Sequence, residues 1–263
     1  MKININQYIL IVLLLISGIS TQNFESNISC SICNNIIKDK EYYVDAWGNP
    51  FHMYHKRTGI FCECCSRIIS EKITNGGYKL DDGRYICTLC DVSVIKSEKE
   101  IENSLNRVLD VLKDNNISNL SREELKINLI NRNSMSEQYK FHEVEHLKGL
   151  TKVIPSEKEI FNIFILNNLP KIQFEAILAH ELLHVWLFKK NINLSKPIME
   201  GFCNLGSYLI YKLDDTKFSR IHLLSLENES TNSNVTEYKI LKSIMDTKGF
   251  NYVAKNIGTI DIE

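Results

Sequence analysis

Two histidines and a glutamate have the spacing H-E-x-x-H in the segment Ala176–Phe188 (AILAHELLHVWLF). Residues four apart share one face of an α-helix, so His180 and His184 can direct ring nitrogens at one metal ion. Glu181 follows the first histidine and can act as general base toward a water molecule at that metal. The chemistry that this pattern predicts is zinc-assisted hydrolysis of a peptide bond.

A catalytic zinc site needs a third protein ligand and one open position. Fifteen residues separate His184 from Glu200, and Pro197 permits a turn between them. We therefore predict that Glu200 is the third ligand and opens a second helix. Asn204 lies four residues further on, where it can contact a ligand histidine or be an ordinary solvated residue.

The short motif is not specific, because a second copy occurs at 142–146 (HEVEH). Charged residues surround that copy, and Gly149 follows it closely. It lacks the sustained apolar stripe of a buried helix, whereas leucines, Val185 and Trp186 surround the first copy. We therefore assign the catalytic helix to the copy at 180–184.

A second group of ligand-type residues precedes the motif by about a hundred positions. Seven of the eight cysteines lie between Cys30 and Cys90, together with two histidines, mostly in pairs with two-residue spacers. Such pairs predict two four-ligand structural zinc sites. The first would use Cys30, Cys33, His52 and His55, and the second Cys62, Cys65, Cys87 and Cys90.

Disulfides are the alternative for these cysteines if the chain is exported. They would not explain two histidines at the matching spacing, and they would leave an odd cysteine in the cluster. Cys64 is the surplus residue and can exchange with Cys62 as a ligand. Cys203 stands apart, and we interpret it as a small buried apolar side chain.

The elements that must position these residues follow from periodicity. Apolar residues predict a helix over 98–114 and another over 172–189, with further helices over 199–213, 237–246 and 252–257. Ser121 with Glu124 resembles a capping box for a short helix. Phe161–Leu166 (FNIFIL) predicts a strand, which we expect at a sheet edge beside the metal helix, where an extended peptide can pair with it.

The N-terminus predicts export. Lys2 precedes the apolar run Tyr8–Ile19, which is shorter than the roughly 20 residues of a membrane-spanning helix. Its length fits the core of a signal peptide, and small residues follow it. We therefore expect residues 1–22 to be cleaved and the protein to be periplasmic or secreted, with an N-terminal membrane anchor as the alternative.

Length and composition set the outline of the fold. The 263 residues carry a net charge of −1 and are 44% hydrophobic. The composition therefore has no basic surplus that would indicate nucleic-acid binding. We predict an α+β protein with a zinc-stapled module over 27–94. A mostly helical HExxH peptidase domain of the zincin type, with a small sheet, would follow over 97–263. The cofactors would be one catalytic and two structural zinc ions.

These features together resemble a known family. The paired Cys/His module is similar to a LIM domain. The segments that carry the resemblance include LDDGRYICTLC, NLP, AHELLH and EGFC. The combination resembles the DA-one family of plant organ-size regulators, which are LIM-domain zinc peptidases. The resemblance implies that His180, His184 and Glu200 bind zinc, that Glu181 is the base and that the substrate is a protein.

The chain departs from that family in three respects. Residues 56–61 form a longer spacer than LIM domains have, which predicts less tightly stacked zinc sites. No ubiquitin-interacting motif is present, and the start resembles an export signal, so we expect a compact, bacterial, exported relative. The alternative to a peptidase is a protein-binding LIM-like module on an inactive peptidase scaffold.

Overall fold

The computed structural model describes residues 28–39, 41–139, 147–154, 160–228 and 234–260. The chain divides into two compact units, Met1–Val92 and Ser93–Glu263, and each is described by itself. The predicted ranges 27–94 and 97–263 place the division a few residues later. The predicted signal peptide, residues 1–22, lies outside the described residues. No helix in the described part of the chain is sufficiently long and apolar to cross a membrane.

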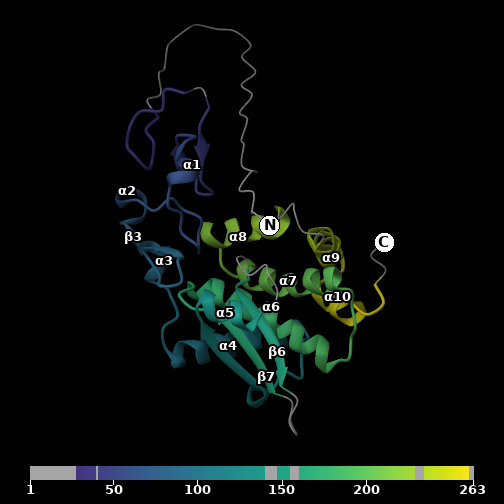
Figure 1. Cartoon of the computed structure of the whole chain (residues 1–263). Helices are drawn as coiled ribbons and strands as arrows, with labels where there is room; N and C mark the ends of the chain where they lie inside the picture. Colours follow the sequence, from purple (N-terminus) through teal and green to yellow (C-terminus); the bar gives the residue numbers. More distant parts are fainter. Residues whose placement is uncertain (1–27, 40, 140–146, 155–159, 229–233, 261–263) are drawn as a thin grey trace, which may run out of the picture. The chain divides into compact units, whose positions relative to one another are not determined.

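The first unit consists of two small hairpin modules (Figure 1). The first contains the antiparallel strands β1 (Tyr43–Val44) and β2 (Pro50–Phe51) and the helix α1 (His55–Thr58). The second contains α2 (Glu71–Thr74), the antiparallel strands β3 (Gly77–Lys79) and β4 (Tyr85–Cys87), and α3 (Thr88–Asp91). Elements this short bury little apolar surface, so the unit needs covalent or metal staples.

Asp45 and Trp47 join the two modules. The Asp45 carboxylate accepts a hydrogen bond from the backbone N–H of Ile68 at 3.0 Å. The Trp47 indole N–H donates to the backbone carbonyl of Cys65 at 2.7 Å. The spacer 56–61 predicted looser stacking, but α1 takes up part of it and these hydrogen bonds hold the modules together.

The second unit is α+β. Its N-terminal half contains α4 (Glu98–Asp114), a 3₁₀ turn (Arg122–Glu124), β5 (Leu125–Ile130), α5 (Arg132–Gln138), β6 (Gly149–Ile154) and β7 (Ile160–Leu166). Its C-terminal half is helical, with α6 (Lys171–Lys189), α7 (Lys196–Lys212), α8 (Lys217–Asn228), α9 (Asn234–Lys248) and α10 (Phe250–Asn256). The predicted helices over 98–114 and 172–189 are confirmed almost to the residue.

The three strands form one sheet in the order β5-β7-β6. β5 runs parallel to β7, and β6 runs antiparallel to it. Phe161–Leu166 is a strand as predicted, but the prediction of an edge position is wrong because β7 has a partner on each side. Most of its side chains are buried, as expected for a central strand. The edges are β5 and β6, which the sequence analysis did not identify.

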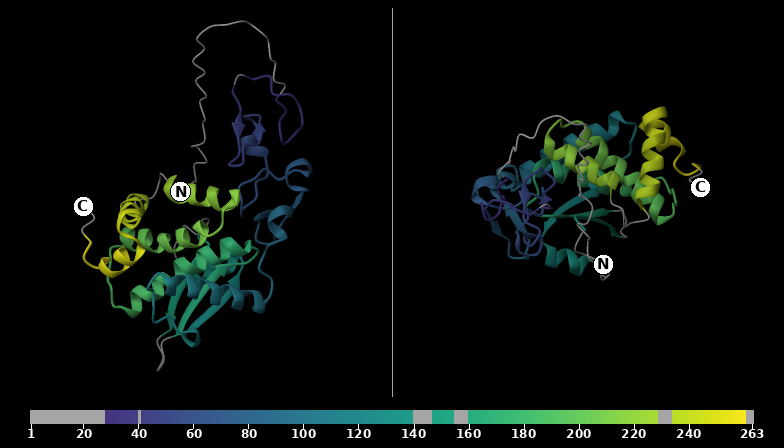
Figure 2. Two further views of the ribbon diagram at one scale, coloured as in Figure 1. Left: turned by 180° about the vertical axis from the view of Figure 1, so that it is seen from behind. Right: turned by 90° about the horizontal axis from the view of Figure 1, so that it is seen from above.

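The helices of this unit lie in layers on the sheet. α6 packs on β6 and β7, α7 packs on α6, and α9 packs on α7 (Figure 1). Seen from behind and from above, the yellow α9 and α10 remain apart from the teal strands, with green helices between them (Figure 2). α6 is therefore covered on several sides, which accounts for its apolar residues around the whole circumference.

Small residues let α7 approach α6 closely. A Cβ atom at Gly206 would lie 2.9 Å from the Ala179 carbonyl oxygen and from Leu183. Ser207 donates a hydrogen bond to the Ala176 carbonyl oxygen at 2.8 Å. Any side chain at Gly206 would push the helices apart. Because the predicted ligands are divided between α6 and α7, this contact sets the distance between them.

Two predicted local features differ from the structure. Ser121 makes no capping hydrogen bond, and a 3₁₀ turn with the strand β5 follows it. The capping box lies instead at Ser97 and Glu100, at the start of α4. Pro197 was expected to permit a turn between His184 and Glu200, but it lies within the first turn of α7, where its missing N–H costs nothing.

Candidate active site and metal-binding clusters

His180, His184 and Glu200 converge at the contact between α6 and α7. The two histidine Nε2 atoms are 3.1 Å apart. The Glu200 Oε2 atom lies 3.3 Å from Nε2 of His180 and 3.9 Å from Nε2 of His184. The histidines come together because they are four residues apart on one helix. Glu200 joins them because the first turns of α7 pack against α6.

This donor triangle has the dimensions of a tetrahedral zinc site. Zinc binds imidazole nitrogen and carboxylate oxygen at about 2.0–2.2 Å, so two ligand atoms of a tetrahedron are about 3.4 Å apart. The three distances of 3.1, 3.3 and 3.9 Å lie around that value. Two imidazoles and one carboxylate are also a ligand set that zinc prefers. The residues present therefore fit a three-ligand zinc site.

Cys203 lies near the same histidines. Its Sγ atom and the ligand nitrogens of His180 and His184 lie within 4.8 Å of one another. Sulfur and nitrogen on one tetrahedral zinc are about 3.6 Å apart. Burial raises the pKa of the Cys203 thiol well above its usual value. The Glu200 carboxylate lies 3.3 and 3.9 Å from the two histidine nitrogens, so Glu200 is the candidate for the third ligand position, with Cys203 as a buried neighbour.

The electrostatics of the triad suit a metal site. Burial and the neighbouring His180 lower the pKa of His184 to about 4, so its ring is neutral at pH 7. Burial opposes the charged form of His180, but the hydrogen bond to Glu200 raises its pKa above the usual value. Burial also opposes the charge of Glu200, but the two histidines keep its pKa below the usual range. Glu200 is thus a carboxylate at neutral pH.

Glu181 is held against the strand β6. Its side chain is buried, and burial raises the pKa of the carboxyl group. The Thr151 hydroxyl donates a hydrogen bond to Glu181 Oε2 at 2.7 Å. On the other side, a Cβ atom at Gly149 would lie 2.4 Å from Glu181 Oε1. A buried carboxyl group with a raised pKa beside a metal site is suited to accept and return a proton.

Asn204 makes a side-chain hydrogen bond to His180. It lies one turn after Glu200 on α7, so one helix presents both a ligand and a partner of a ligand. Such a hydrogen bond fixes the orientation of a metal-binding ring. The sequence left open whether Asn204 contacts a ligand histidine or is an ordinary solvated residue. The structure agrees with the contact.

The cysteines and histidines of the first unit form two clusters. One contains Cys30, Cys33, His52 and His55, and the other Cys62, Cys65, Cys87 and Cys90, each with its ligand atoms within 4.8 Å of one another. In the first, Cys33 Sγ lies 3.5 Å from His52 Nδ1. In the second, Cys65 Sγ lies 3.7 Å from Cys87 Sγ. Tetrahedral zinc with sulfur at about 2.3 Å requires about 3.6 Å and 3.8 Å respectively.

The thiols in both clusters have altered acidity. Burial opposes the thiolate of Cys30, but hydrogen bonds from the backbone of Cys33 and His52 lower its pKa to about 7. The pKa of Cys87 is also lowered to about 7, with the neighbouring thiols of Cys62 and Cys65 pulling in opposite directions. The pKa of Cys62 is lowered as well, whereas hydrogen bonding to Cys62 raises the pKa values of Cys65 and Cys90. Thiolate is the form that binds zinc.

All eight cysteines fall within the described residues, and none of them is in a disulfide bond. The disulfide alternative is therefore not seen. Cys64 is buried beside the second cluster but is not one of its four ligands. The second H-E-x-x-H copy, at 142–146, lies outside the described residues.

Thr151 and Gly149 are the residues of this site that sequence analysis missed. Their segment GLTKVI contains a lysine and follows a charged stretch, so it did not stand out as a strand. The β-branched residues Thr151, Val153 and Ile154 were the available signal for a strand. Phe188, near the end of α6, is 46% exposed and packs edge-on against Phe161.

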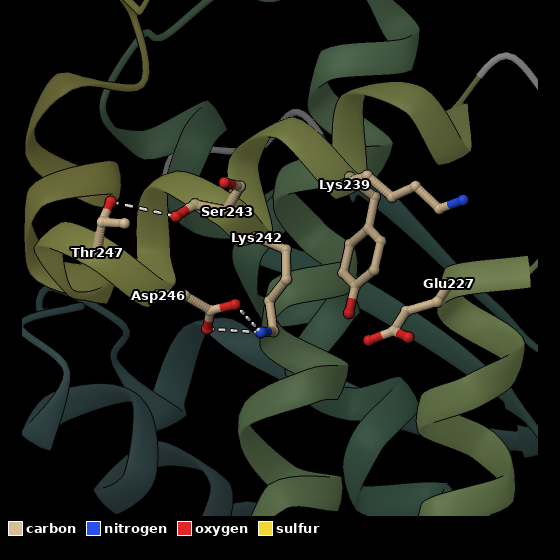
Figure 3. A pocket seen from close by; sticks show the side chains of 7 residues that line it. Glu227, Lys239, Lys242, Ser243, Asp246 and Thr247 are labelled. Atoms are coloured by element: carbon tan, nitrogen blue, oxygen red, sulfur yellow. Dashed lines mark hydrogen bonds and ion pairs between the residues drawn. The ribbon is translucent and has the colours of Figure 1, made fainter.

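A separate pocket lies in the C-terminal helices (Figure 3). Its volume is about 420 Å³, and it is lined by residues of α8 and α9: Glu227, Tyr238, Lys239, Lys242, Ser243, Asp246 and Thr247. The Lys242 Nζ atom pairs with Asp246 at 2.6 Å. None of the residues predicted from the sequence to do chemistry lies in this pocket.

Known proteins resemble this chain in sequence. The sequence model of the DA1-like family, described as "Protein DA1", matches residues 115–261. The chain is 24% identical to Protein DA1-related 2 of Arabidopsis thaliana over 68% of this chain and 41% of that protein. It is 26% identical to LIM domain-containing protein HDR3 of Oryza sativa subsp. japonica over 62% of this chain and 39% of that protein. The chain thus spans about two fifths of the length of these relatives. No solved structure matches it.

Proposed function

This chain belongs to the DA1-like family, and from that premise we propose that it is a zinc-dependent endopeptidase with Glu181 as general base. The observation that carries the proposal is the donor triangle of His180, His184 and Glu200, next to a buried glutamate. Three donors around a tetrahedral zinc leave one position open, as hydrolysis requires. A zinc ion bound there would polarise the scissile carbonyl and make the attacking water more acidic.

Residues of the chain would transfer the proton and hold the metal ligands in place. Glu181 takes a proton from the attacking water and returns it to the leaving amine, for which its raised pKa is suited. Glu200 supplies negative charge at the metal, and Asn204 holds the His180 ring. The packed helices around the site exclude bulk water, which strengthens each of these interactions.

The substrate that we propose is an extended segment of a protein. β6 is an edge strand, and its residue Thr151 contacts Glu181 directly. An extended peptide can add to such an edge through main-chain hydrogen bonds, which places its carbonyl groups near Glu181. This role was predicted for Phe161–Leu166, but that segment is the central strand.

We propose that the first unit binds two structural zinc ions. Each of its clusters has four sulfur or imidazole donors, which close the coordination sphere and leave no place for chemistry. One relative is named for its LIM domain. Such a unit can stabilise the protein or bind a protein partner. We also propose export, as the N-terminal sequence predicts; the residues that carry this prediction lie outside the described residues.

The test compares wild-type protein with the variant Glu181→Gln. Zinc content and cleavage of casein are measured on the same samples. We expect three zinc ions per chain in both proteins and cleavage by the wild type alone, because the amide cannot accept the proton. Equal cleavage by both, or a wild type without zinc at the α6–α7 site, would contradict the proposal. Full zinc content without any cleavage would favour an inactive peptidase scaffold that carries a protein-binding module.

A further inference from the structure

We propose that Thr151 is a positioning residue that anchors one oxygen of Glu181 and that Gly149 lets the other oxygen lie directly against the strand β6. Together the two residues would hold the carboxylate of the base in one orientation. This inference rests on the proposed peptidase function and adds two residues of β6 to its machinery.

The anchor is a single hydrogen bond. The Thr151 hydroxyl lies 2.7 Å from Glu181 Oε2 and 3.4 Å from the backbone carbonyl oxygen of Glu181. A threonine hydroxyl has one proton to donate, so the nearer and charged acceptor takes it. Glu181 is only 5% exposed, so few waters compete for that oxygen. The bond therefore fixes the carboxylate in one orientation.

The second oxygen is packed against the strand. A Cβ atom at position 149 would come within 2.4 Å of Glu181 Oε1 and within 2.7 Å of Ile177 Cγ2. The place that a side chain at 149 would take is therefore filled by Glu181 and Ile177. Glycine at this position allows the carboxylate to lie this close to β6.

One strand supplies both features. Gly149 and Thr151 are two positions apart on β6, so they lie on the same face of the sheet. Their backbone is fixed by pairing with β7, where Gly149 faces Ile165 and Thr151 faces Ile163. The base on α6 is therefore oriented by a paired strand and not by a loop. A group held in this way costs no reorganisation during the reaction.

The first test separates the hydroxyl from the shape of the side chain. Thr151→Val keeps the shape and removes the hydroxyl, and Thr151→Ser keeps the hydroxyl. We expect the valine variant to lose about 10- to 100-fold in kcat on casein with KM nearly unchanged, and serine to restore kcat to within about threefold. Thr247→Val, on an exposed face of α9, is the matched control. A valine variant with wild-type kcat, or a serine variant as slow as valine, would overturn the inference.

The second test does not depend on cleavage. Crystal structures of zinc-loaded wild type and Thr151→Val are compared at Glu181, and zinc content is measured alongside. We expect the carboxylate to leave its position in the variant while zinc content stays unchanged. A carboxylate within about 0.5 Å of its wild-type place would overturn the anchoring role. A wild type that cleaves no casein contradicts the proposed function, whereas this comparison still decides whether Thr151 anchors Glu181.

Gly149→Ala tests the second half of the inference. The added methyl group cannot fit without moving Glu181 or Ile177, so we expect a loss in kcat comparable to that of Thr151→Val. The crystal structure of this variant should show Glu181 displaced from the strand. Wild-type kcat with an undisplaced carboxylate would show that glycine at position 149 has no role.

Discussion

The two Cys/His clusters of the first unit and the histidine–glutamate site of the second differ in how their surroundings hold them. Each cluster has four donors on very short strands and turns, with a small apolar core. The α6–α7 site has three donors on helices of 19 and 17 residues that are buried against a sheet and another helix. In the first unit, zinc binding would stabilise the fold. In the second unit, the packing of the helices positions the ligand residues without a metal. This difference predicts opposite responses to the loss of zinc.

The largest expected effect is on the folding of the first unit. Cys62→Ser removes a ligand of the second cluster, and binding of a structural zinc supplies about 10–16 kcal/mol of folding free energy in small domains. We expect backbone amides of the second hairpin module, residues 60–91, to lose protection from hydrogen exchange. Amides of α6 and α7 should keep their protection, because buried apolar contacts hold those helices.

Cys64→Ser is the matched control for that experiment. Cys64 is equally buried but is outside the four-ligand set, so this variant should retain its zinc and its protected amides. If Cys64→Ser loses the zinc and Cys62→Ser does not, Cys64 is the ligand and the two residues exchange roles. Full protection in both variants would mean that zinc does not staple this unit.

The next largest effect is expected on zinc binding at the α6–α7 site. Glu200→Ala removes one of three donors, and we expect zinc affinity at the α6–α7 site to fall by more than about 100-fold, with loss of cleavage. The thermal stability of the second unit should change little, because the helices pack without the metal. Lys212→Ala, exposed at the other end of α7, should behave as wild type. The expectation is wrong if zinc affinity at this site survives the loss of Glu200.

A smaller effect is expected from Asn204→Ala. The variant keeps all three donors but loses the hydrogen bond to His180. Outer hydrogen bonds of this kind contribute about 10- to 100-fold in metal affinity. We expect a loss near the lower limit, measured by competition with a zinc chelator. Unchanged affinity would mean that packing alone orients the His180 ring.

Zinc binding at the α6–α7 site should depend on one proton. In the metal-free site Glu200 is ionised and His184 is neutral, because their pKa values are lowered, while His180 has a raised pKa and carries the proton. Affinity therefore falls as the pH falls, by about tenfold per unit below the pKa of His180, and levels off above it. Calorimetry in buffers of different ionisation enthalpy should give about one proton released per zinc between about pH 5.5 and 6.5. Release of two protons, or of none, would contradict these protonation states.

The sequence predicted the parts of the site that local periodicity encodes. His180, Glu181 and His184 share a helix, and Glu200 begins the next one, so spacing and a turn signal were sufficient. The contacts of Thr151 and Gly149 with Glu181 span about thirty residues and depend on the register of β6 against β7. No local pattern carries that register. At Ser121 the capping signal was misleading, because a 3₁₀ turn follows it and the next residues pair with β7 as the strand β5.

The most direct test of the difference between the two regions is a crystal structure of the zinc-loaded protein with anomalous data at the zinc edge. We predict three zinc peaks. Two should be bound only by the four protein donors of each cluster, and the third by His180, His184, Glu200 and one non-protein ligand. A third peak that is absent, or that is closed by the Cys203 sulfur as a fourth protein ligand, would contradict the proposal of an open catalytic site.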